Sequence, residues 1–132
     1  MKLSALRKKL NLPVGDFIVA VHGIIHPSKG YDQMLKWWKN ISLNYPSWKL
    51  LIIGGAGKEK WCREKISELG LINKVIMTGW LPNQMMVNEY LNAADCLLVT
   101  RRNTSLRPSN SASYFTSAIS ASEITPFFSL LA

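Results

Sequence analysis

Short apolar runs alternate with the apolar stripes of helices along most of this chain. The runs lie at residues 17–24, 48–53, 75–77 and 96–99, and the helical stripes lie between them at 31–45, 61–69 and 86–94. Strands that are apolar on both faces and are joined by amphipathic helices form parallel sheets with crossover connections. The predicted fold class is therefore α/β, with a parallel sheet, flanking helices and one domain spanning residues 1–132.

The two ends of the chain have weaker patterns. Residues 1–10 resemble a short basic helix that closes at Asn11-Leu12-Pro13. Near the other end, Pro108 is predicted to start a helix, since Pro favours the first helical turn. The residues expected to face inward from that helix are Ala112, Phe115 and Ile119. A fifth strand is predicted at 124–131, at an edge or with an irregular end because it contains Pro126.

Composition limits the classes of partner. The chain has 132 residues, is 48% hydrophobic and 18% charged, which is typical of a soluble globular protein. Its formal net charge of +8 favours anionic partners such as phosphorylated ligands, nucleic acid or an anionic membrane surface. The alternative is a solvated basic surface. Nucleic-acid binding rests on charge alone, so no nucleic-acid partner is predicted.

The cysteines and the N-terminal segment indicate in which cellular compartment the protein is expected. Cys62 and Cys96 have no metal-ligand spacing and lie among apolar residues, so both are predicted to be buried free thiols, as in a reducing cytoplasm. The first 13 residues lack the apolar core of a signal peptide, and no apolar run approaches the length of a membrane span. We expect a cytoplasmic protein, with peripheral contact at the inner face of the membrane left open.

The loop after the first run has the residues of an anion site. Gly23 ends the run. At the start of the next predicted helix, Lys29 provides a cation and Gly30 leaves the backbone accessible to a ligand. A cation beside a helix N-terminus favours a phosphate group. The alternative is a solvated lysine. His22 and His26 are separated by Gly23, so they are not a helical ligand pair, and no metal is predicted.

Three further segments follow the ends of predicted strands. Gly54-Gly55-Ala56-Gly57 lacks the third glycine of a dinucleotide fingerprint, so a tight turn is favoured over a nucleotide loop. Trp80, unlike the other tryptophans, lies in a strand-end loop, where it would flank a base or close a pocket. Arg101 and its neighbours Arg102 and Arg107 would clamp a diphosphate or remain solvated.

The step Ser109-Asn110-Ser111 leads into the predicted last helix. Its side chains and backbone would donate to a phosphate or simply cap that helix.

Five motifs, in order and at familiar spacings, resemble the donor-binding domain of group 1 glycosyltransferases. The lead-in at 6–13 is also similar to that family's opening segment, and the resemblance runs from about Leu6 to Thr100. The motifs are the strand ending at Gly23 with Lys29-Gly30-Tyr31-Asp32, then the segments 48–54, 74–81, Glu89-Tyr90 and 94–98.

The resemblance implies a Rossmann-like parallel sheet with flanking helices, one half of a GT-B fold. It also implies a uridine or guanosine diphosphate sugar as donor, transfer with retained anomeric configuration, a role in glycan biosynthesis, and no metal or other cofactor. In the family's pattern, Lys29 matches the contact to the donor diphosphate, Gly23 the glycine that opens the phosphate loop, and Leu81 a position whose backbone borders the nucleobase.

Two features depart from the family pattern. Relatives often carry arginine directly after the first glycine, where this chain has Ile24. Many also carry two glutamates eight residues apart after the fourth strand, but beyond Asp95 this chain has only Glu123. If Glu123 to Pro126 marks the approach to the fifth strand, the two glutamate positions fall near Ser111 and Ile119. Either the Ser/Asn-rich helix start then binds the donor in their place, or donor binding is compromised.

The acceptor-binding half of such an enzyme would lie outside this sequence, and the domain is expected to be incomplete at its C-terminus. The predicted function is donor binding within a hexosyltransferase-type enzyme. Its partners would be a nucleotide-diphosphate sugar and the acceptor-binding domain or subunit, and the isolated chain is expected to be inactive, with no catalytic residue assigned. The alternative is a non-catalytic nucleotide- or protein-binding module that joins a partner chain or a second copy through an open sheet edge.

Overall fold

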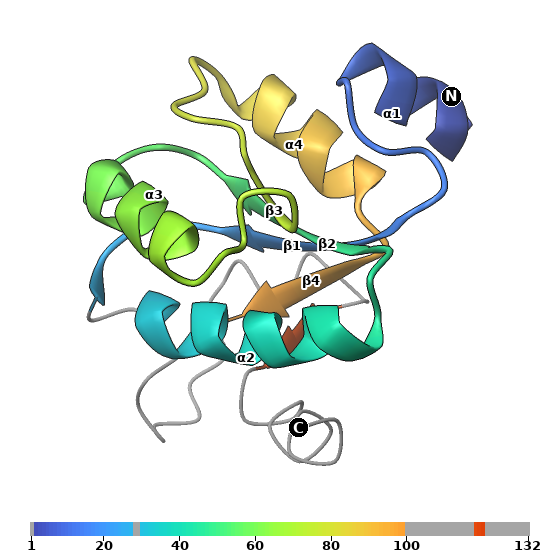
Figure 1. Ribbon diagram of the computed structural model, residues 1–132. Helices are drawn as coiled ribbons and strands as arrows, with labels where there is room; N and C mark the ends of the chain where they lie inside the picture. The colour runs from blue at the N-terminus through green and yellow to red at the C-terminus, as the bar shows by residue number, and fades with distance from the viewer. Residues whose placement is uncertain (1, 28–29, 100–117, 121–132) are drawn as a thin grey trace.

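The computed structural model describes residues 2–27, 30–99 and 118–120. Figure 1 shows a central sheet with α1 and α4 on one side and α2 on the other. The elements follow the chain as α1 (Leu3–Lys9), β1 (Phe17–His22), α2 (Tyr31–Asn44), β2 (Trp48–Ile53), α3 (Glu59–Glu68), β3 (Val75–Met77), α4 (Gln84–Ala93), β4 (Cys96–Val99) and β5 (Ala118–Ser120). The predicted α/β class and the alternation of strands and helices are confirmed.

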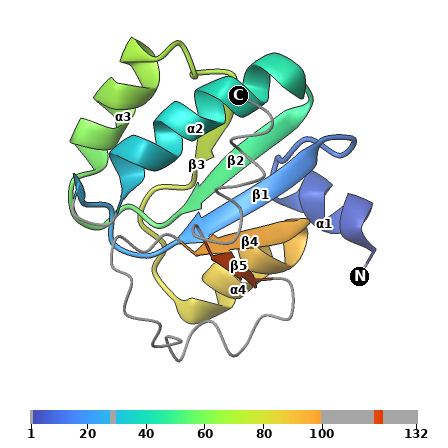
Figure 2. The ribbon, with the colours of Figure 1, turned by 90° about the horizontal axis from the view of Figure 1, so that it is seen from below.

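All pairs of neighbouring strands are parallel, in the order β3-β2-β1-β4-β5. The register places Phe17 beside Trp48 and His22 beside Ile53. The order runs one way from β1 to β3 and the other way from β1 to β5, so it reverses between β1 and β4. Open α/β sheets bind ligands at such a reversal, outside the carboxyl ends of the strands. In Figure 2 the arrowheads of β1 and β2 point to the end of the sheet away from α1.

Each face of the sheet has its own core. On one face, Val19, Val21, Leu50 and Ile52 pack with the inner sides of α2 and α3. On the other, the alternate strand residues pack with α1 and α4; this second group is Ile18, Ala20, Leu51, Ile53 and Leu97 with Val87 and Ala93. Because both faces are covered, β1 and β2 read as continuous apolar runs rather than alternating ones.

The helices follow from their apolar stripes and their ends. The buried residues of α2 recur at helical spacing: Tyr31, Met34, Leu35, Trp38 and Ile41. The helix ends at Asn44, before Pro46, which cannot continue a helix. In α4 the Asn83 side chain accepts a hydrogen bond from the Met86 amide at 2.9 Å, a side-chain N-cap. None of the helices in the described ranges is long and apolar enough to cross a bilayer.

One prediction for the last third of the chain is wrong at Ile119. This residue was expected on the inner face of a helix, but it lies in β5 and pairs with Leu98 of β4. A spacing of three and four residues over so short a segment does not distinguish helix from strand, and pairing with β4 decides the outcome. The predicted start of that helix at Pro108 and the strand predicted at 124–131 lie outside the described residues.

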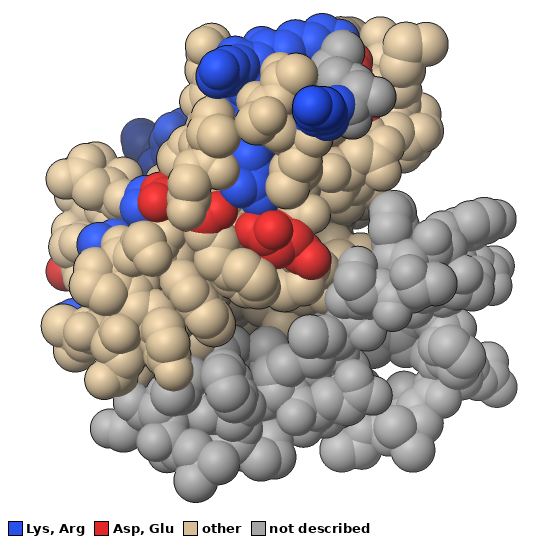
Figure 3. All heavy atoms as spheres, turned by 90° about the vertical axis from the view of Figure 1, so that its right-hand side faces the viewer, with Lys and Arg blue, Asp and Glu red and all other residues tan. Residues whose placement is uncertain are grey.

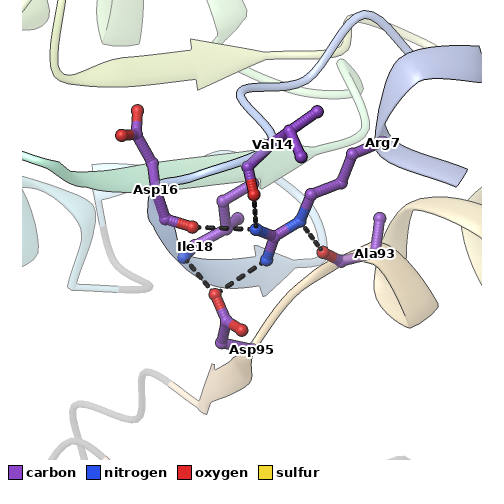
Figure 4. A network of polar contacts seen from close by, with 6 residues as sticks. All are labelled: Arg7, Val14, Asp16, Ile18, Ala93 and Asp95. Atoms are coloured by element: carbon purple, nitrogen blue, oxygen red, sulfur yellow. Dashed lines mark hydrogen bonds and ion pairs between the residues drawn. The ribbon is translucent and has the colours of Figure 1, made fainter. Parts of the chain in front are cut away.

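A buried arginine joins the amino ends of β1 and β4. Arg7 of α1 is 2% exposed, although it stands among consecutive basic residues. Figure 4 shows its guanidinium surrounded by acceptors from the loop before β1 and from the segment that joins α4 to β4. It donates to the carbonyl of Ala93 at 2.9 Å, to those of Val14 and Asp16 at 3.1 and 2.8 Å, and to the Asp95 carboxylate at 2.7 Å. The Ile18 amide of β1 donates to the same carboxylate oxygen at 2.7 Å.

Both cysteines are free thiols, as predicted. Cys62, on the inner side of α3, is fully buried, whereas Cys96 is only partly buried. Burial raises the pKa of each thiol to about 11. The described residues contain no cluster of three or more His, Cys, Asp or Glu side chains that could hold a metal ion.

Candidate functional site

Three strand-end loops meet at the carboxyl edge of the sheet. We call residues 23–27, 54–58 and 78–82, which follow β1, β2 and β3, the strand-end platform. Its glycines provide left-handed turns directly after the strands: Gly23 has φ 141°, Gly54 104° and Gly79 74°. Glycine adopts these conformations without the steric cost that other residues incur, so the chain can turn at once and leave backbone at the surface.

The first two loops are joined through their backbones. The Ile25 amide donates to the Ala56 carbonyl at 3.1 Å, and the Lys58 amide donates to the Ile25 carbonyl at 2.7 Å. Between them, a Cβ on Gly57 would lie only 2.4 Å from the Ile25 carbonyl oxygen, and Gly57 has φ 88°. Only glycine fits this approach, so Gly57 holds one loop against the other.

The third loop joins the second. The Gly54 amide donates to the Thr78 hydroxyl at 2.9 Å, and that hydroxyl donates to the Gly79 carbonyl at 2.8 Å. A Cβ on Gly55 would lie 2.4 Å from the Trp80 backbone nitrogen. The Gly54-to-Gly57 segment connects β2 to α3, and isolated bridges join Gly54 to Gly79 and Gly57 to Ile25. It therefore lies between the two outer loops of the platform and contacts both.

Two large apolar side chains stand exposed on the platform. Ile24 is 59% exposed and Trp80 is 70% exposed, on the first and third loops. Leu81, next to Trp80, is instead half-buried and packs toward the core beneath α4. Exposed aromatic and aliphatic surface beside accessible backbone is suited to a flat, partly apolar ligand such as a nucleobase.

The described charge on the platform is positive. Lys58 is exposed and is the one Lys or Arg among platform residues. Glu59, the next residue, is engaged by Arg63, with nitrogen–oxygen distances of 3.1 and 2.7 Å. Partial burial lowers the pKa of His22 at the end of β1, which keeps its ring neutral at pH 7. The Glu59 carboxylate lies toward the third loop, since a Cβ on Gly55 would lie 2.7 Å from its Oε2 atom, so the positive charge of the platform stands where the second loop meets the first.

The basic surface near α1 differs from the platform because two of its Lys residues are paired with carboxylates. Figure 3 shows Lys and Arg gathered at the end where α1 lies in Figure 1, with acidic side chains below them. Lys9 pairs with Glu89 at 2.6 Å, and Lys49 pairs with Asp16 at 3.0 Å. Part of this charge is therefore neutralised locally, at the sheet edge opposite the platform.

The structure describes some of the predicted site residues. Gly23, Trp80 and Leu81 belong to the platform, and Gly30 lies beside it as the N-cap of α2 with φ 80°. The remaining predicted site residues lie outside the described ranges: Lys29, Arg101, Ser109, Asn110 and Ser111. Their assignment to donor binding stays a prediction.

Two contributors to the platform had no role in the sequence-based prediction. Thr78 is absent from the predicted site residues, yet its hydroxyl bridges two loops. Lys58 is likewise absent from the predicted site residues. The sequence could have indicated Lys58, because it directly follows Gly57 and stands at the N-cap of α3.

The fold and its platform define a Rossmann-like α/β domain with a ligand edge at the carboxyl ends of its strands. A comparison with family models matches residues 4–106 to the group 1 glycosyl transferases. The chain belongs to this family, as the motifs predicted. A comparison with curated proteins gave no match.

Solved structures show the same fold. The C-terminal domain of LpcC, a group 1 glycosyl transferase from Francisella tularensis, superposes with a TM-score of 0.64 at 19% identity, covering 74% of this chain and 52% of that one. Sucrose-phosphate synthase from Thermosynechococcus elongatus gives 0.60 at 24% identity, covering 71% and 24%. HepE from Anabaena, solved with UDP and glucose, gives 0.57 at 23% identity, covering 74% and 26%. The chain thus spans about half of the LpcC C-terminal domain and about a quarter of the other two chains. The prediction of a GT-B C-terminal domain fold is confirmed.

Proposed function

We propose that this chain is the donor-binding domain of a glycosyltransferase and that a nucleoside diphosphate sugar binds at the strand-end platform. The observation that carries the proposal is that the platform's first loop follows β1, which borders the reversal of strand order, in a chain of this family. Turns at Gly23, Gly54 and Gly79 leave backbone accessible there, and Trp80 offers a ring for the base. Support for uridine diphosphate comes from HepE, which was solved with UDP.

The proposal also covers where the acceptor binds and how the sugar is transferred. We place the acceptor on a separate domain or subunit facing the platform, and we expect transfer with retention without a bound metal. The described residues include no group that we assign as a catalytic acid or base. Donor binding, which needs only this domain, is therefore the activity to test first.

Uridine diphosphate should raise the thermal stability of the folded chain. A ligand that binds only the native state at 100 times its Kd stabilises it by about 2.7 kcal/mol. Lys29→Gln should remove most of the shift, because it deletes the cation that the family pattern places on the diphosphate. Differential scanning fluorimetry with UDP, GDP and uridine would compare the wild type, Lys29→Gln and Lys39→Gln.

Lys39 is the matched control. It is exposed on α2, eight residues beyond the helix start and so about 12 Å along its axis. Lys39→Gln should keep the wild-type shift. Equal shifts for both variants would remove Lys29 from the site, and the absence of any shift with millimolar UDP or GDP would refute donor binding.

A further inference from the structure

Lys58 combines three properties on the platform. It is exposed, it is the sole Lys or Arg of the described platform loops, and no carboxylate of the described residues pairs with it. Its side chain makes no capping hydrogen bond to α3, although it occupies the N-cap position. The ammonium group is therefore not needed by the described fold.

The backbone fixes where Lys58 stands. Its amide donates to the Ile25 carbonyl at 2.7 Å, and Gly57 before it pairs with Ile25 in an isolated parallel bridge. The preceding glycine also approaches the Ile24 side chain, since a Cβ on Gly57 would lie 2.9 Å from the Ile24 Cγ2 atom. Lys58 is thus held beside the loop that follows β1, the strand that borders the reversal of strand order.

The neighbouring ionisable groups leave this positive charge in place. Glu59, the nearest carboxylate in sequence, accepts two hydrogen bonds from Arg63 at its Oε1 atom. Its Oε2 atom lies toward the third loop rather than the first, since a Cβ on Gly55, the residue against Trp80, would lie 2.7 Å from it. His22, at the end of β1, is neutral at pH 7. A lysine ammonium on a flexible stem, with three donors, can adapt to phosphate oxygens without a fixed planar geometry.

We propose that Lys58 binds the diphosphate of the donor from the second loop of the platform, in addition to the ligand predicted at Lys29. The inference rests on the proposed function, because it assigns one more residue to the same donor. If so, the Gly54-to-Gly57 segment does more than join the loops, because it also positions the Lys58 ammonium group beside the phosphates.

Isothermal titration calorimetry would measure the affinity for UDP and for uridine in the wild type, Lys58→Gln and Lys39→Gln. We expect Lys58→Gln to weaken UDP binding about tenfold, which is the scale of one charge-assisted hydrogen bond. Uridine, which has no phosphate, should bind both variants as it binds the wild type. Lys58→Arg should retain most of the UDP affinity, and the salt dependence of UDP binding should be shallower in Lys58→Gln.

The outcomes separate this inference from the proposed function. Wild-type binding of UDP with equal affinities in Lys58→Gln and Lys39→Gln would overturn the role of Lys58 alone. An equal loss of UDP and uridine binding in Lys58→Gln would also overturn it, since the effect would not depend on phosphate. Failure of the wild type to bind UDP would refute the proposed function, and the role of Lys58 with it.

Discussion

Replacing Arg7 with methionine is expected to cost about 3 kcal/mol in the free energy of unfolding, the lower end for breaking a buried ion pair. The guanidinium is 3% exposed and satisfies three backbone carbonyls as well as the Asp95 carboxylate. Methionine fills similar space but leaves these acceptors without their donor. Asp95 is 25% exposed, so water reaches its carboxylate and keeps the cost from being larger.

Urea denaturation followed by tryptophan fluorescence would measure this loss. Lys8→Met is the control, because Lys8 is the exposed neighbour on the same helix and should change stability by less than about 0.5 kcal/mol. A midpoint for Arg7→Met that matches the control would show that the network in Figure 4 contributes nothing to stability. UDP binding to the folded fraction should be unchanged, because Arg7 lies at the opposite edge of the sheet.

Replacing Gly57 with alanine should damage both stability and donor binding. The residue has φ 88°, and its new Cβ would lie 2.4 Å from the Ile25 carbonyl oxygen, which is backbone and cannot rotate away. A left-handed conformation costs a residue with a Cβ roughly 1–2 kcal/mol. Overpacking adds about 1–3 kcal/mol. We therefore expect a loss of roughly 3 kcal/mol and a weakened affinity for UDP, because the two loops must separate.

Gly15→Ala is the matched control for this substitution. Gly15 lies in an exposed loop, its backbone is not left-handed, and a Cβ there would meet no atom within 4 Å. That variant should be neutral or slightly more stable, since alanine restricts the unfolded chain. Equal urea midpoints and UDP affinities for the two alanine variants would contradict the account of the platform as loops in mutual contact.

The sequence predicts most of the sheet because its central strands are buried on both faces. Trp48–Ile53, Val75–Met77 and Cys96–Val99 have the bounds that their apolar runs indicate, and β1 differs only in ending at His22. Ile119 was assigned to a helix because a local pattern was read without its partner strand. Its pairing with Leu98 is tertiary information that a single segment does not contain.

The site is predicted less completely for a related reason. Glycine spacing indicates turns at the strand ends, but it does not show that Gly55 lies against Trp80, which is 25 residues away along the chain. Arg7 likewise reads as one of several basic residues, since arginine is seldom buried unless it is paired. Its partners, Ala93 and Asp95, are more than 80 residues away, so no local pattern reveals them.

Mapping UDP onto the folded, isotope-labelled chain by amide chemical shifts tests the central claim most directly. Binding at the strand-end platform predicts shifts at Gly23, at the amides from Gly54 to Lys58, and from Gly79 to Leu81. The amides around Arg7 and Asp95 should stay unmoved. Shifts confined to that opposite edge, or none at millimolar UDP, would contradict the proposal that this platform holds the donor.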